Sequence, residues 1–416
     1  MKAQPTLLAA ALALAGSAHA ASVVEMYGTV FPVFDSAETK NATTVAPADR
    51  PTQLPASAYT GANDLRRNRI TVGTTNWGFR GYEDLWPGLR AVWQLESGFQ
   101  IDQNAGPGIG ARDSKVGLQS PAWGEIFLGQ WDTPYKYISL PVNPLRGGYV
   151  FDRTAITGNP GMGVGNTTTQ FTRIGAKPDA SFDRRQGNSV QYWTPTWGGV
   201  SMRFVHSVNE GQAAVVAGGP VVSPVLNAAS IVWNWGQLSL RYGYEEHRDY
   251  FGLSQLGGGA AGTATNGTSK DTGQKFVWLY RIGNTRFTGL VEKLKYHNSD
   301  TTAGNVTEYK RTAWYAVVEQ FFDASKQSVF FSYGRAADGD CTRVGPLACV
   351  TTDLGAKYMT LGYIYRFSKR TEGFLMYYRM DNKRNAQYSP GPMVNAASIA
   401  PGADTAAAGF GIIHFF

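Results

Sequence analysis

The chain has 416 residues, of which 43% are hydrophobic, 13% aromatic and 17% charged, and its formal net charge is +7. No stretch approaches the roughly 18 to 20 apolar residues that a membrane-spanning helix requires, which excludes a helical membrane protein. Lys and Arg are scattered singly, which excludes the clustered basic surface of a nucleic-acid-binding protein. The many aromatic residues leave two classes, an aromatic-rich soluble β-protein or a membrane β-barrel with interfacial aromatic girdles.

The first 20 residues predict a secretory signal peptide. Lys2 is followed by the apolar run 7–15 and by Ala18-His19-Ala20, which together fit a charged start, a short hydrophobic core and a cleavage site. We expect residues 1–20 to be removed during export. No linker or composition break divides the remainder, so residues 21–416 are expected to form one domain.

Strand-like stretches of about 8 to 14 residues follow, and short connectors alternate with long ones. They begin with 23–34, and counting them along the chain gives about 16 strands. In 238–245, Leu and Tyr share one face while Ser, Arg, Gly and Glu share the other. Because a charge facing lipid is costly, the polar face should look into a wet interior. The sequence therefore predicts an all-β fold, a 16-stranded antiparallel transmembrane β-barrel.

The same argument applies to the strand that includes 374–381. Phe374 and Met376 alternate with Tyr377, Arg379 and Asp381. We expect Arg379 and Asp381 to face the interior of the barrel, and the Phe and Met side chains to face lipid.

The longest connector is 132–185. Loops beyond about 12 to 15 residues without secondary structure are usually functional or disordered. This one contains more aromatic residues than a solvated surface loop favours, namely Tyr135, Tyr137, Tyr149, Phe151, Phe171 and Phe182. We therefore expect it to fold inward as a constriction loop rather than to remain an open surface loop.

Two cysteines and several weak motifs remain. Cys341 and Cys349 lie in one loop of a chain expected to pass through an oxidising compartment, so we predict a disulfide between them. Neither a His cluster nor a second Cys pair accompanies them, so we expect no metal and no other cofactor. The glycine-rich 257–262 lacks the strand-to-helix context of a dinucleotide site, and no P-loop, zinc-protease or nucleophile-elbow motif occurs. An outer-membrane hydrolase would need a nucleophile beside His and carboxylate partners, and this pattern is missing, so we expect no enzyme.

The last residues alternate again. In 408–416 a bulky or apolar residue occupies every second position, and the chain ends on Phe416. A closed barrel pairs its last strand with its first, so that no hydrophobic edge is left open. Counting back from Phe416 places His414 on the same face as Ile412 and Phe410. That face should lie near the periplasmic interface.

These fragments together resemble the trimeric general porins of Gram-negative bacteria, of the neisserial and burkholderial type. The resemblance rests on segments spread along the whole expected mature chain and found in the family's order: 27–28, 77–85, 88–99, 116–118, 188–192, 368–371 and 414–416. It implies a bacterial outer-membrane barrel of 16 strands, a homotrimer, and a third external loop folded into the pore. It also implies that Phe416 and His414 form the tail read by the barrel-assembly machinery.

The resemblance also implies a set of residues at the pore constriction. The family's basic wall positions fall on Arg112 and Arg185, and a wall carboxylate falls on Glu96. Asn76 stands where anion-preferring relatives often carry Arg, and Gln130 ends a stretch that is Leu-Gly-Arg in many relatives. The full set of expected constriction and selectivity residues is Arg112, Arg185, Glu96, Asn76, Arg80, Asp132, Arg153 and Asp183.

The sequence therefore predicts passive diffusion of small hydrophilic solutes and ions through a water-filled channel, with a mild preference for anions. The expected partners are outer-membrane lipid and lipopolysaccharide, two further copies of the chain, and small hydrophilic or anionic solutes. The alternative is a substrate-selective channel of the same fold that uses the long loop as a binding site.

Overall fold

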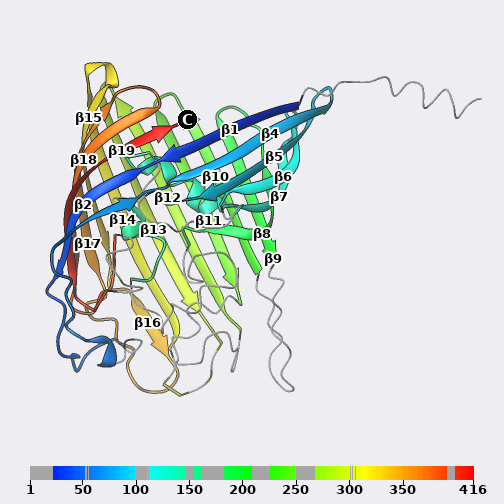
Figure 1. Cartoon of the computed structure of the whole chain (residues 1–416). Coiled ribbons are helices and arrows are strands. Elements are labelled where there is room, and N and C mark those ends of the chain that lie inside the picture. The colour runs from blue at the N-terminus through cyan, green and yellow to red at the C-terminus, as the bar shows by residue number, and fades with distance from the viewer. Residues whose placement is uncertain are drawn as a thin grey trace, which may run out of the picture.

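The structure, a computed structural model, describes residues 22–51, 54, 56–99, 101, 110, 112–146, 153–161, 182–208, 225–249, 268–299, 301, 303–304, 306–390 and 399–416. The expected signal peptide, 1–20, lies outside these residues, as do 147–152 and 162–181 of the expected constriction loop. The described residues form a single antiparallel sheet that closes on itself as a barrel (Figure 1).

The described sheet has 19 strands. They are β1 (Ser22–Val30), β2 (Pro32–Lys40), β3 (Arg67–Val72), β4 (Asn76–Trp86), β5 (Leu89–Gly98), β6 (Ser114–Ser120), β7 (Gly124–Asp132), β8 (Arg185–Trp193), β9 (Val200–Val208), β10 (Val225–Trp235), β11 (Leu238–Arg248), β12 (Lys270–Ile282), β13 (Thr285–His297), β14 (Val306–Phe322), β15 (Gln327–Ala336), β16 (Asp340–Arg343), β17 (Ala356–Arg366), β18 (Thr371–Asn382) and β19 (Asp404–Phe415).

The barrel wall consists of 16 spans, most of them a single strand and two of them a pair of consecutive strands. β1 and β2 form one bent span, because both lie along β19, and β3 and β4 form the next span beside them. β16 is a short strand in a loop and pairs with the far end of β14. When each pair is counted as one span and β16 is left out, the 19 strands give the 16 spans that the sequence predicted.

The helical segments of the described chain are short. They are η1 (Ala56–Ala58), α2 (Pro134–Tyr137), η2 (Leu140–Val142), η3 (Arg153–Ala155) and η6 (Asp323–Ser325). Among the residues described, no helix has the length and apolar character needed to cross a bilayer. α2, η2 and η3 all belong to the long connector between β7 and β8.

The first two spans bend where their strands break. Pro32, which has no N–H to donate, follows Phe31, and the Phe31 N–H donates to Thr75 Oγ1 at 3.1 Å. In the neighbouring span, Ile70 is exposed on the outer face whereas Asn76 is buried inside. Both residue numbers are even, so the irregular residues 73–75 switch the face on which side chains lie. The first span continues to Lys40 rather than ending at residue 34 as predicted.

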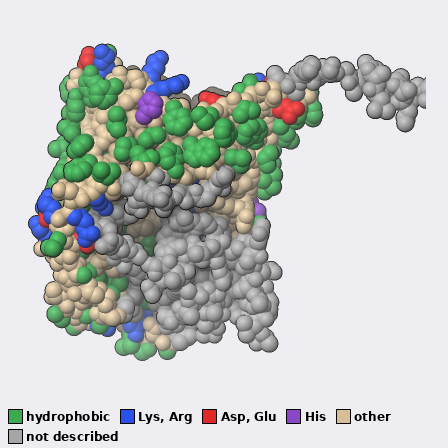
Figure 2. Space-filling model, viewed as in Figure 1, with side chains coloured by type: hydrophobic (Ala, Val, Ile, Leu, Met, Phe, Trp, Pro, Cys, Tyr) green, Lys and Arg blue, Asp and Glu red, His purple; other side chains and the backbone are tan. Residues whose placement is uncertain are grey.

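The outside of the barrel is apolar. Figure 2 shows hydrophobic side chains spread over the outer wall near the tight turns, with charged side chains gathered at its rim. Seven exposed aromatic residues lie in or beside the tight turns, namely Trp86, Trp123, Trp197, Trp235, Tyr280, Phe322 and Phe367. This arrangement fits the predicted aromatic girdle at one membrane interface. The tight turns and the carboxyl terminus lie at the top of Figure 1, and β16 lies at the bottom.

The last strand closes the barrel as predicted. The N–H of Phe416 donates to the carbonyl of Gly28, and the N–H of Gly28 donates to the carbonyl of Phe416, each at 3.1 Å. A Cβ on Gly28 would collide with the Phe416 ring, so the ring lies directly over this glycine. His414 is exposed on the same outer face, and its Nδ1 lies 2.9 Å from Thr371 Oγ1. The closure therefore includes ring packing as well as backbone pairing.

The predicted orientation of β18 is wrong. Phe374 and Met376 point inward and are 3% and 4% exposed, whereas Arg379 and Asp381 form an exposed ion pair on the outside. The inward residues belong to a buried apolar cluster that also contains residues of the long connector. The strand reverses the expected polarity because its inner neighbour is protein. Arg379 and Asp381 lie near the end of β18 that is remote from the tight turns, where the outer surface meets polar groups instead of lipid tails.

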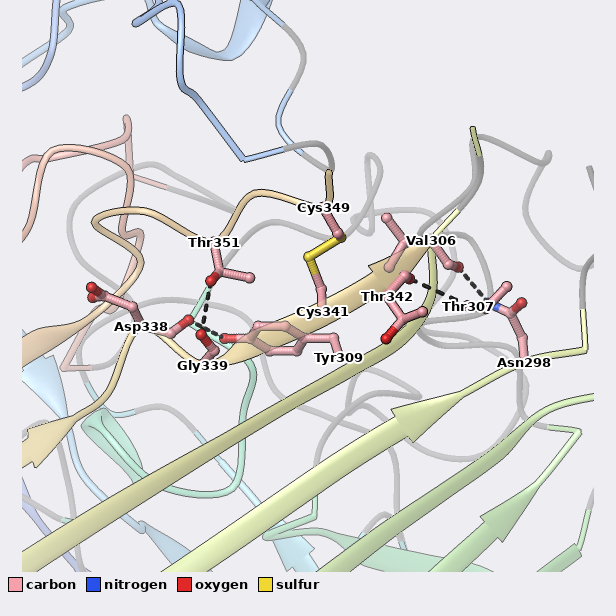
Figure 3. Close-up of a disulfide and its surroundings, with 10 residues drawn as sticks. All are labelled: Asn298, Val306, Thr307, Tyr309, Asp338, Gly339, Cys341, Thr342, Cys349 and Thr351. Carbon is pink, nitrogen blue, oxygen red and sulfur yellow. Dashed lines mark hydrogen bonds between the residues drawn. A yellow bond between two sulfur atoms is a disulfide. The ribbon is translucent and has the colours of Figure 1, made fainter. Parts of the chain in front are cut away.

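The predicted disulfide is present. Cys341, on β16, is bonded to Cys349, with the two Cα atoms 5.6 Å apart (Figure 3). Nearby, Thr351 Oγ1 donates to the Gly339 carbonyl at 2.7 Å, and the Tyr309 hydroxyl lies 3.3 Å from the Asp338 carbonyl. The disulfide therefore joins a locally ordered loop segment to β16, which pairs with β14.

Candidate functional site

A ladder of charged side chains lines the inner face of the first spans. Arg80 Nε donates to Glu25 Oε2 at 2.8 Å, and the Arg80 guanidinium lies 5.0 Å from the centre of the Tyr27 ring. The Tyr27 hydroxyl donates to Glu96 Oε2 at 3.0 Å. Strand register places Arg80 opposite Glu25 and Gly78 opposite both Tyr27 and Glu96. These groups therefore share the inner face of β1, β4 and β5.

The ladder continues through the connector before β6. Arg112 Nε donates to the other oxygen of Glu96, Oε1, at 2.5 Å. Since Arg112 precedes the first residue of β6, strand alternation does not govern the direction of its side chain. Its carbonyl accepts from the side-chain amide of Gln130 at 3.2 Å. Glu96 thus receives one donor from Tyr27 and another from Arg112, which fixes the carboxylate against the wall.

Asp113, Asp132 and Arg185 form the next step of the ladder. Arg185 Nε bonds to Asp113, and its Nη2 lies 3.5 Å from Asp132 Oδ1. Lys136, at the start of the long connector, donates to the same Asp132 oxygen at 2.6 Å. Burial and the charge of Asp132 raise the pKa of Asp113, and Arg185 only partly opposes them. Asp113 is therefore protonated at a higher pH than an ordinary aspartate.

Lys115 ends the ladder beside three aromatic rings. Its Nζ bonds to Glu125 and lies 4.4 Å from the ring centres of both Trp131 and Trp193 and 4.6 Å from that of Phe127. Cations are attracted to the electron-rich faces of aromatic rings. The rings therefore hold Lys115 in place while leaving its charge near the interior.

Two arginines on the same side of the barrel have no carboxylate partner among the described residues. Arg203 on β9 lies 3.3 Å from the Tyr137 ring centre and 3.8 Å from that of Trp193. Arg241 on β11 donates to Ser239 Oγ at 3.0 Å. The two arginines lie close enough for their charges to interact.

We use the name charged wall for all of these groups together. Its cations are Arg80, Arg112, Lys115, Lys136, Arg185, Arg203 and Arg241, and its carboxylates are Glu25, Glu96, Asp113, Glu125 and Asp132. Seven cations against five carboxylates leave an excess of two positive charges. The excess resides in Arg203 and Arg241, which have no carboxylate partner in the described part of the chain.

The opposite side of the interior is covered by the described parts of the long connector. Asp183 lies 2.9 Å from Lys275 Nζ on β12 and 3.3 Å from Arg153 Nη2. The Tyr135 hydroxyl donates to Glu292 Oε2 on β13 at 2.9 Å, and the N–H of Gly158 donates to Glu292 Oε1 at 2.8 Å. These groups are almost fully buried. Connector and wall are thus joined by a buried network of charges.

A third wall strand takes part in this network. Arg311 on β14 donates to the Asn159 carbonyl at 2.7 Å and contacts Glu292 at 3.3 Å. Burial alone would raise the pKa of Asp183, but the charges of Lys275 and Arg153 outweigh this effect and lower the pKa to about 2. We call Asp183, Arg153, Tyr135, Lys275, Glu292 and Arg311 the loop anchor.

An apolar cluster extends the contact between connector and wall. It combines Ile138, Val142, Leu145, Ala155 and Ile156 of the connector with wall residues that include Tyr315, Phe330, Tyr358, Phe374, Met376, Tyr378 and Met380. The Thr288 hydroxyl on β13 also donates to the Val142 carbonyl at 3.4 Å. We call this apolar inner face the covered wall. Its buried area and the loop anchor together stabilise the inward position of these connector residues.

The structure separates the predicted constriction residues into two groups. Asn76, Arg80, Glu96, Arg112, Asp132 and Arg185 come together on or beside the charged wall. Arg153 and Asp183 do not join them, because they are 0% and 2% exposed within the loop anchor. We therefore correct their assignment from pore lining to the loop anchor, because Asp183 pairs with Arg153 and with Lys275 of β12 in a buried network.

Several residues of the site were not predicted from the sequence. Lys115 and Arg203 lie on strands whose outward neighbours are apolar, so alternation could have placed both inside. Tyr137 was noted only as one aromatic of the long connector, and Trp193 was not singled out at all. No sequence signal links Tyr137, Trp193 and Arg203, because three separate segments bring them together. Over the part of the chain that is described, no group of three or more His, Cys, Asp or Glu residues is arranged to hold a metal ion.

The closed barrel, its apolar exterior and its charged inner wall define a transmembrane β-barrel protein. The sequence matches the Gram-negative porin family over residues 6–385, and the chain belongs to this family. It is an outer-membrane protein, as are the relatives to which its sequence is similar.

Two relatives and one solved structure show how far the similarity extends. An outer membrane porin protein of Bordetella pertussis is 31% identical over 219 residues, which are 49% of this chain and 47% of that protein, so the match spans about half of either sequence. Major outer membrane protein P.IA of Neisseria meningitidis is 25% identical over 365 residues, 83% of this chain and 85% of that protein. The fold is similar to that of the anion-selective porin from Comamonas acidovorans, with a TM-score of 0.68 and 19% identity over 95% of this chain and 100% of that one.

Proposed function

We propose that the protein forms a water-filled channel through which small hydrophilic solutes and ions diffuse passively across the outer membrane, with a mild preference for anions. The observation that carries this proposal is the charged wall, with its seven cations and five carboxylates on one inner face of the barrel. Fixed charge in a narrow aqueous passage raises the local concentration of ions of opposite sign. The similarity of the fold to the anion-selective porin from Comamonas acidovorans supports the same direction.

The preference should be mild because most cations of the charged wall are paired. A guanidinium and a carboxylate in contact, such as Arg112 and Glu96 at 2.5 Å, largely cancel each other's field at a distance. Arg203 and Arg241 have no such partner among the described residues. We assign most of the anion preference to these two arginines.

We further propose that the connector 132–185 is the constriction loop of this channel. Its described residues contact the inner faces of β9 to β14 and β18, so they occupy part of the cross-section. The passage then lies between the connector and the charged wall. The connector leaves the sheet at Asp132 and rejoins it at Arg185. These two residues therefore belong both to the charged wall and to the ends of the connector.

Assembly is a separate part of the proposal. We propose a homotrimer on the basis of the family resemblance, and an assembly role for Phe416 on the basis of its packing over Gly28. Phe416→Ala should reduce the amount of heat-modifiable trimer in the outer membrane and leave the conductance of assembled channels unchanged. Trimer levels equal to those of the wild type would contradict the assembly role.

Reconstitution in planar lipid bilayers tests the proposed function. We expect stepwise conductance increments, and across a KCl gradient a zero-current potential with the sign of a mildly chloride-selective channel. Swelling of proteoliposomes in sugars of increasing size would show diffusion of neutral solutes. A protein that inserts without conducting would contradict the channel, and a potassium-selective potential would contradict the anion preference alone.

A further inference from the structure

The space beside Arg203 is a cavity of about 810 Å³ near the tight turns. Arg203, Trp193 and Tyr137 line it, together with residues of the turns after β4, β6 and β8. Tyr137 comes from α2 of the long connector, Trp193 from the end of β8 and Arg203 from β9. The cavity therefore lies where the proposed constriction loop approaches the tight-turn end of the barrel.

Arg203 lies against two aromatic rings. Its guanidinium carbon lies 3.3 Å from the Tyr137 ring centre and 3.8 Å from the Trp193 ring centre. Both distances are within the range of a cation–π contact. Stacking of this kind holds the group rigid and leaves its N–H donors pointing outward in the plane.

Those donors have no acceptor among the described residues. Within the described residues, Arg203 makes no hydrogen bond and no ion pair, although five other cations of the charged wall are bonded to a carboxylate. A guanidinium edge matches a carboxylate in a planar, bidentate pair of hydrogen bonds. The edge of Arg203 is therefore preorganised for an acceptor that the described protein does not supply.

The other residues around the cavity favour an anion of low charge with an apolar body. Glu125 and Asp84 also line the cavity, but they are paired with Lys115 and Arg90, so among the described lining residues only the charge of Arg203 lacks a partner of opposite sign. Pro121 and Pro195 add apolar surface next to the Trp193 ring. This combination suits the single planar charge of a carboxylate better than a doubly charged phosphate.

We propose that Arg203, Trp193 and Tyr137 form a binding subsite for small organic monocarboxylates, in particular those with an aromatic or apolar body. The subsite rests on the proposed channel, because solutes reach the cavity through the barrel interior. The carboxylate accepts from the edge of Arg203, and the body of the solute lies along Trp193 and the two prolines. Bound solute obstructs the passage at the tight-turn side of the constriction and is carried through it at saturable rates.

The test uses benzoate as a probe in single-channel recordings of the full-length protein in KCl. We expect benzoate to reduce the open-channel current in a saturable manner, and benzyl alcohol, its uncharged counterpart, to have no effect. Benzoate should also change the tryptophan fluorescence of the detergent-solubilised protein with the same midpoint. Inorganic phosphate at pH 8 should block far less than benzoate, and equal or stronger phosphate block would overturn the assignment to monocarboxylates.

Arg203→Lys is the decisive variant, because it keeps the positive charge and removes the planar fork. We expect benzoate block to weaken by about tenfold while the zero-current potential stays close to that of the wild type. The matched control is Arg281→Gln. Arg281 also lies over an aromatic ring, at 4.8 Å from the Phe321 centre, but outside the cavity lining. Its loss should leave benzoate block unchanged.

The outcomes separate the subsite from the channel proposal. Unchanged benzoate block in Arg203→Lys would overturn the subsite even if the channel remains anion-selective. Saturable benzoate block in a channel without anion preference would overturn the proposed preference and leave the subsite standing. If Arg203→Lys does not assemble, Tyr137→Leu takes its place, since it removes one covering ring from the connector side. Wild-type block in Tyr137→Leu would overturn the subsite equally.

Discussion

The two inner faces of this barrel differ although strands of the same alternating pattern build both. On the charged wall, inward residues such as Arg80 and Glu96 are polar and outward residues such as Leu95 are apolar. On the covered wall, Met376 and Phe374 point inward and are buried. The charged wall borders the proposed passage and meets the connector at Tyr137, whereas the covered wall packs against the long connector.

The difference shows what alternation reports. A period of two shows that the faces of a strand have different neighbours, but it does not identify those neighbours. Charged residues do not mark the interior on β18, because protein fills the space there.

A new lysine should have opposite consequences on the two walls. Met376→Lys buries an ammonium group among apolar connector residues, which should cost more than about 4 kcal/mol and prevent normal assembly. Gln94→Lys places the same group on the inner face opposite Arg80, where the passage is open. This variant should assemble and show stronger anion preference. Semi-native gels and zero-current potentials would measure both effects, and equal assembly of the two variants would remove the contrast between the walls.

The loop anchor should be the next most sensitive feature. Lys275→Met leaves Asp183 buried with Arg153 as its remaining ionic partner among the described residues, which should destabilise the anchor by about 3 to 5 kcal/mol. We expect larger and noisier single-channel currents as the connector leaves the covered wall. The double variant Asp183→Asn with Lys275→Met removes both charges and should recover much of the loss. A double variant as noisy as the single one would contradict an electrostatic anchor.

Mild acid should increase anion preference through the charged wall. The pKa of Asp113 is raised by burial and by Asp132, so this group is protonated at a higher pH than an ordinary aspartate. As the pH is lowered from 7 into the acidic range, Asp113 loses its negative charge sooner than an ordinary aspartate would, and Arg185 is partly released. Zero-current potentials measured over this range should shift towards chloride. Asp113→Asn should already show the shifted value at pH 7, and a full wild-type pH response in this variant would exclude Asp113 as the origin.

The disulfide should matter least for conduction. Replacing Cys341 and Cys349 with serine removes the cross-link in the loop after β15. The folded state of that loop should lose about 2 to 3 kcal/mol of stability. Because this loop lies at the end of the barrel remote from the tight turns, single-channel conductance should be unchanged. Limited proteolysis of intact cells should instead cleave the loop faster. A large fall in conductance would place the loop closer to the passage than the structure does.

The fold could be predicted from sequence because it depends on local, repeated features. Strand alternation and the alternation of short with long connectors were enough to predict 16 spans. The position of residue 416 at the end of an alternating strand was enough to predict that the barrel closes. Two details could not be predicted in this way. The switch of faces at 73–75 and the continuation of the first span to Lys40 depend on contacts with Phe31 and with β19.

The candidate site could be predicted only where the family resemblance supplied positions. Arg112, Arg185 and Glu96 were expected and lie together, whereas Arg153 and Asp183 were expected beside them and lie in the loop anchor. A charged residue in a connector carries no local sign of whether it meets the passage or a buried partner. For Asp183 the position depends on Lys275, which is 92 residues away in the sequence. The same reason hides the grouping of Tyr137, Trp193 and Arg203.

The most direct test of the account is the zero-current potential of the wild type and of the double variant Arg203→Gln with Arg241→Gln across the same KCl gradient. The account predicts a chloride-selective potential in the wild type, because seven cations of the charged wall face five carboxylates. The zero-current potential of the double variant should fall to nearly zero, because five charges of each sign then remain on the charged wall. A potassium-selective wild type, or a double variant with the wild-type potential, would contradict the account.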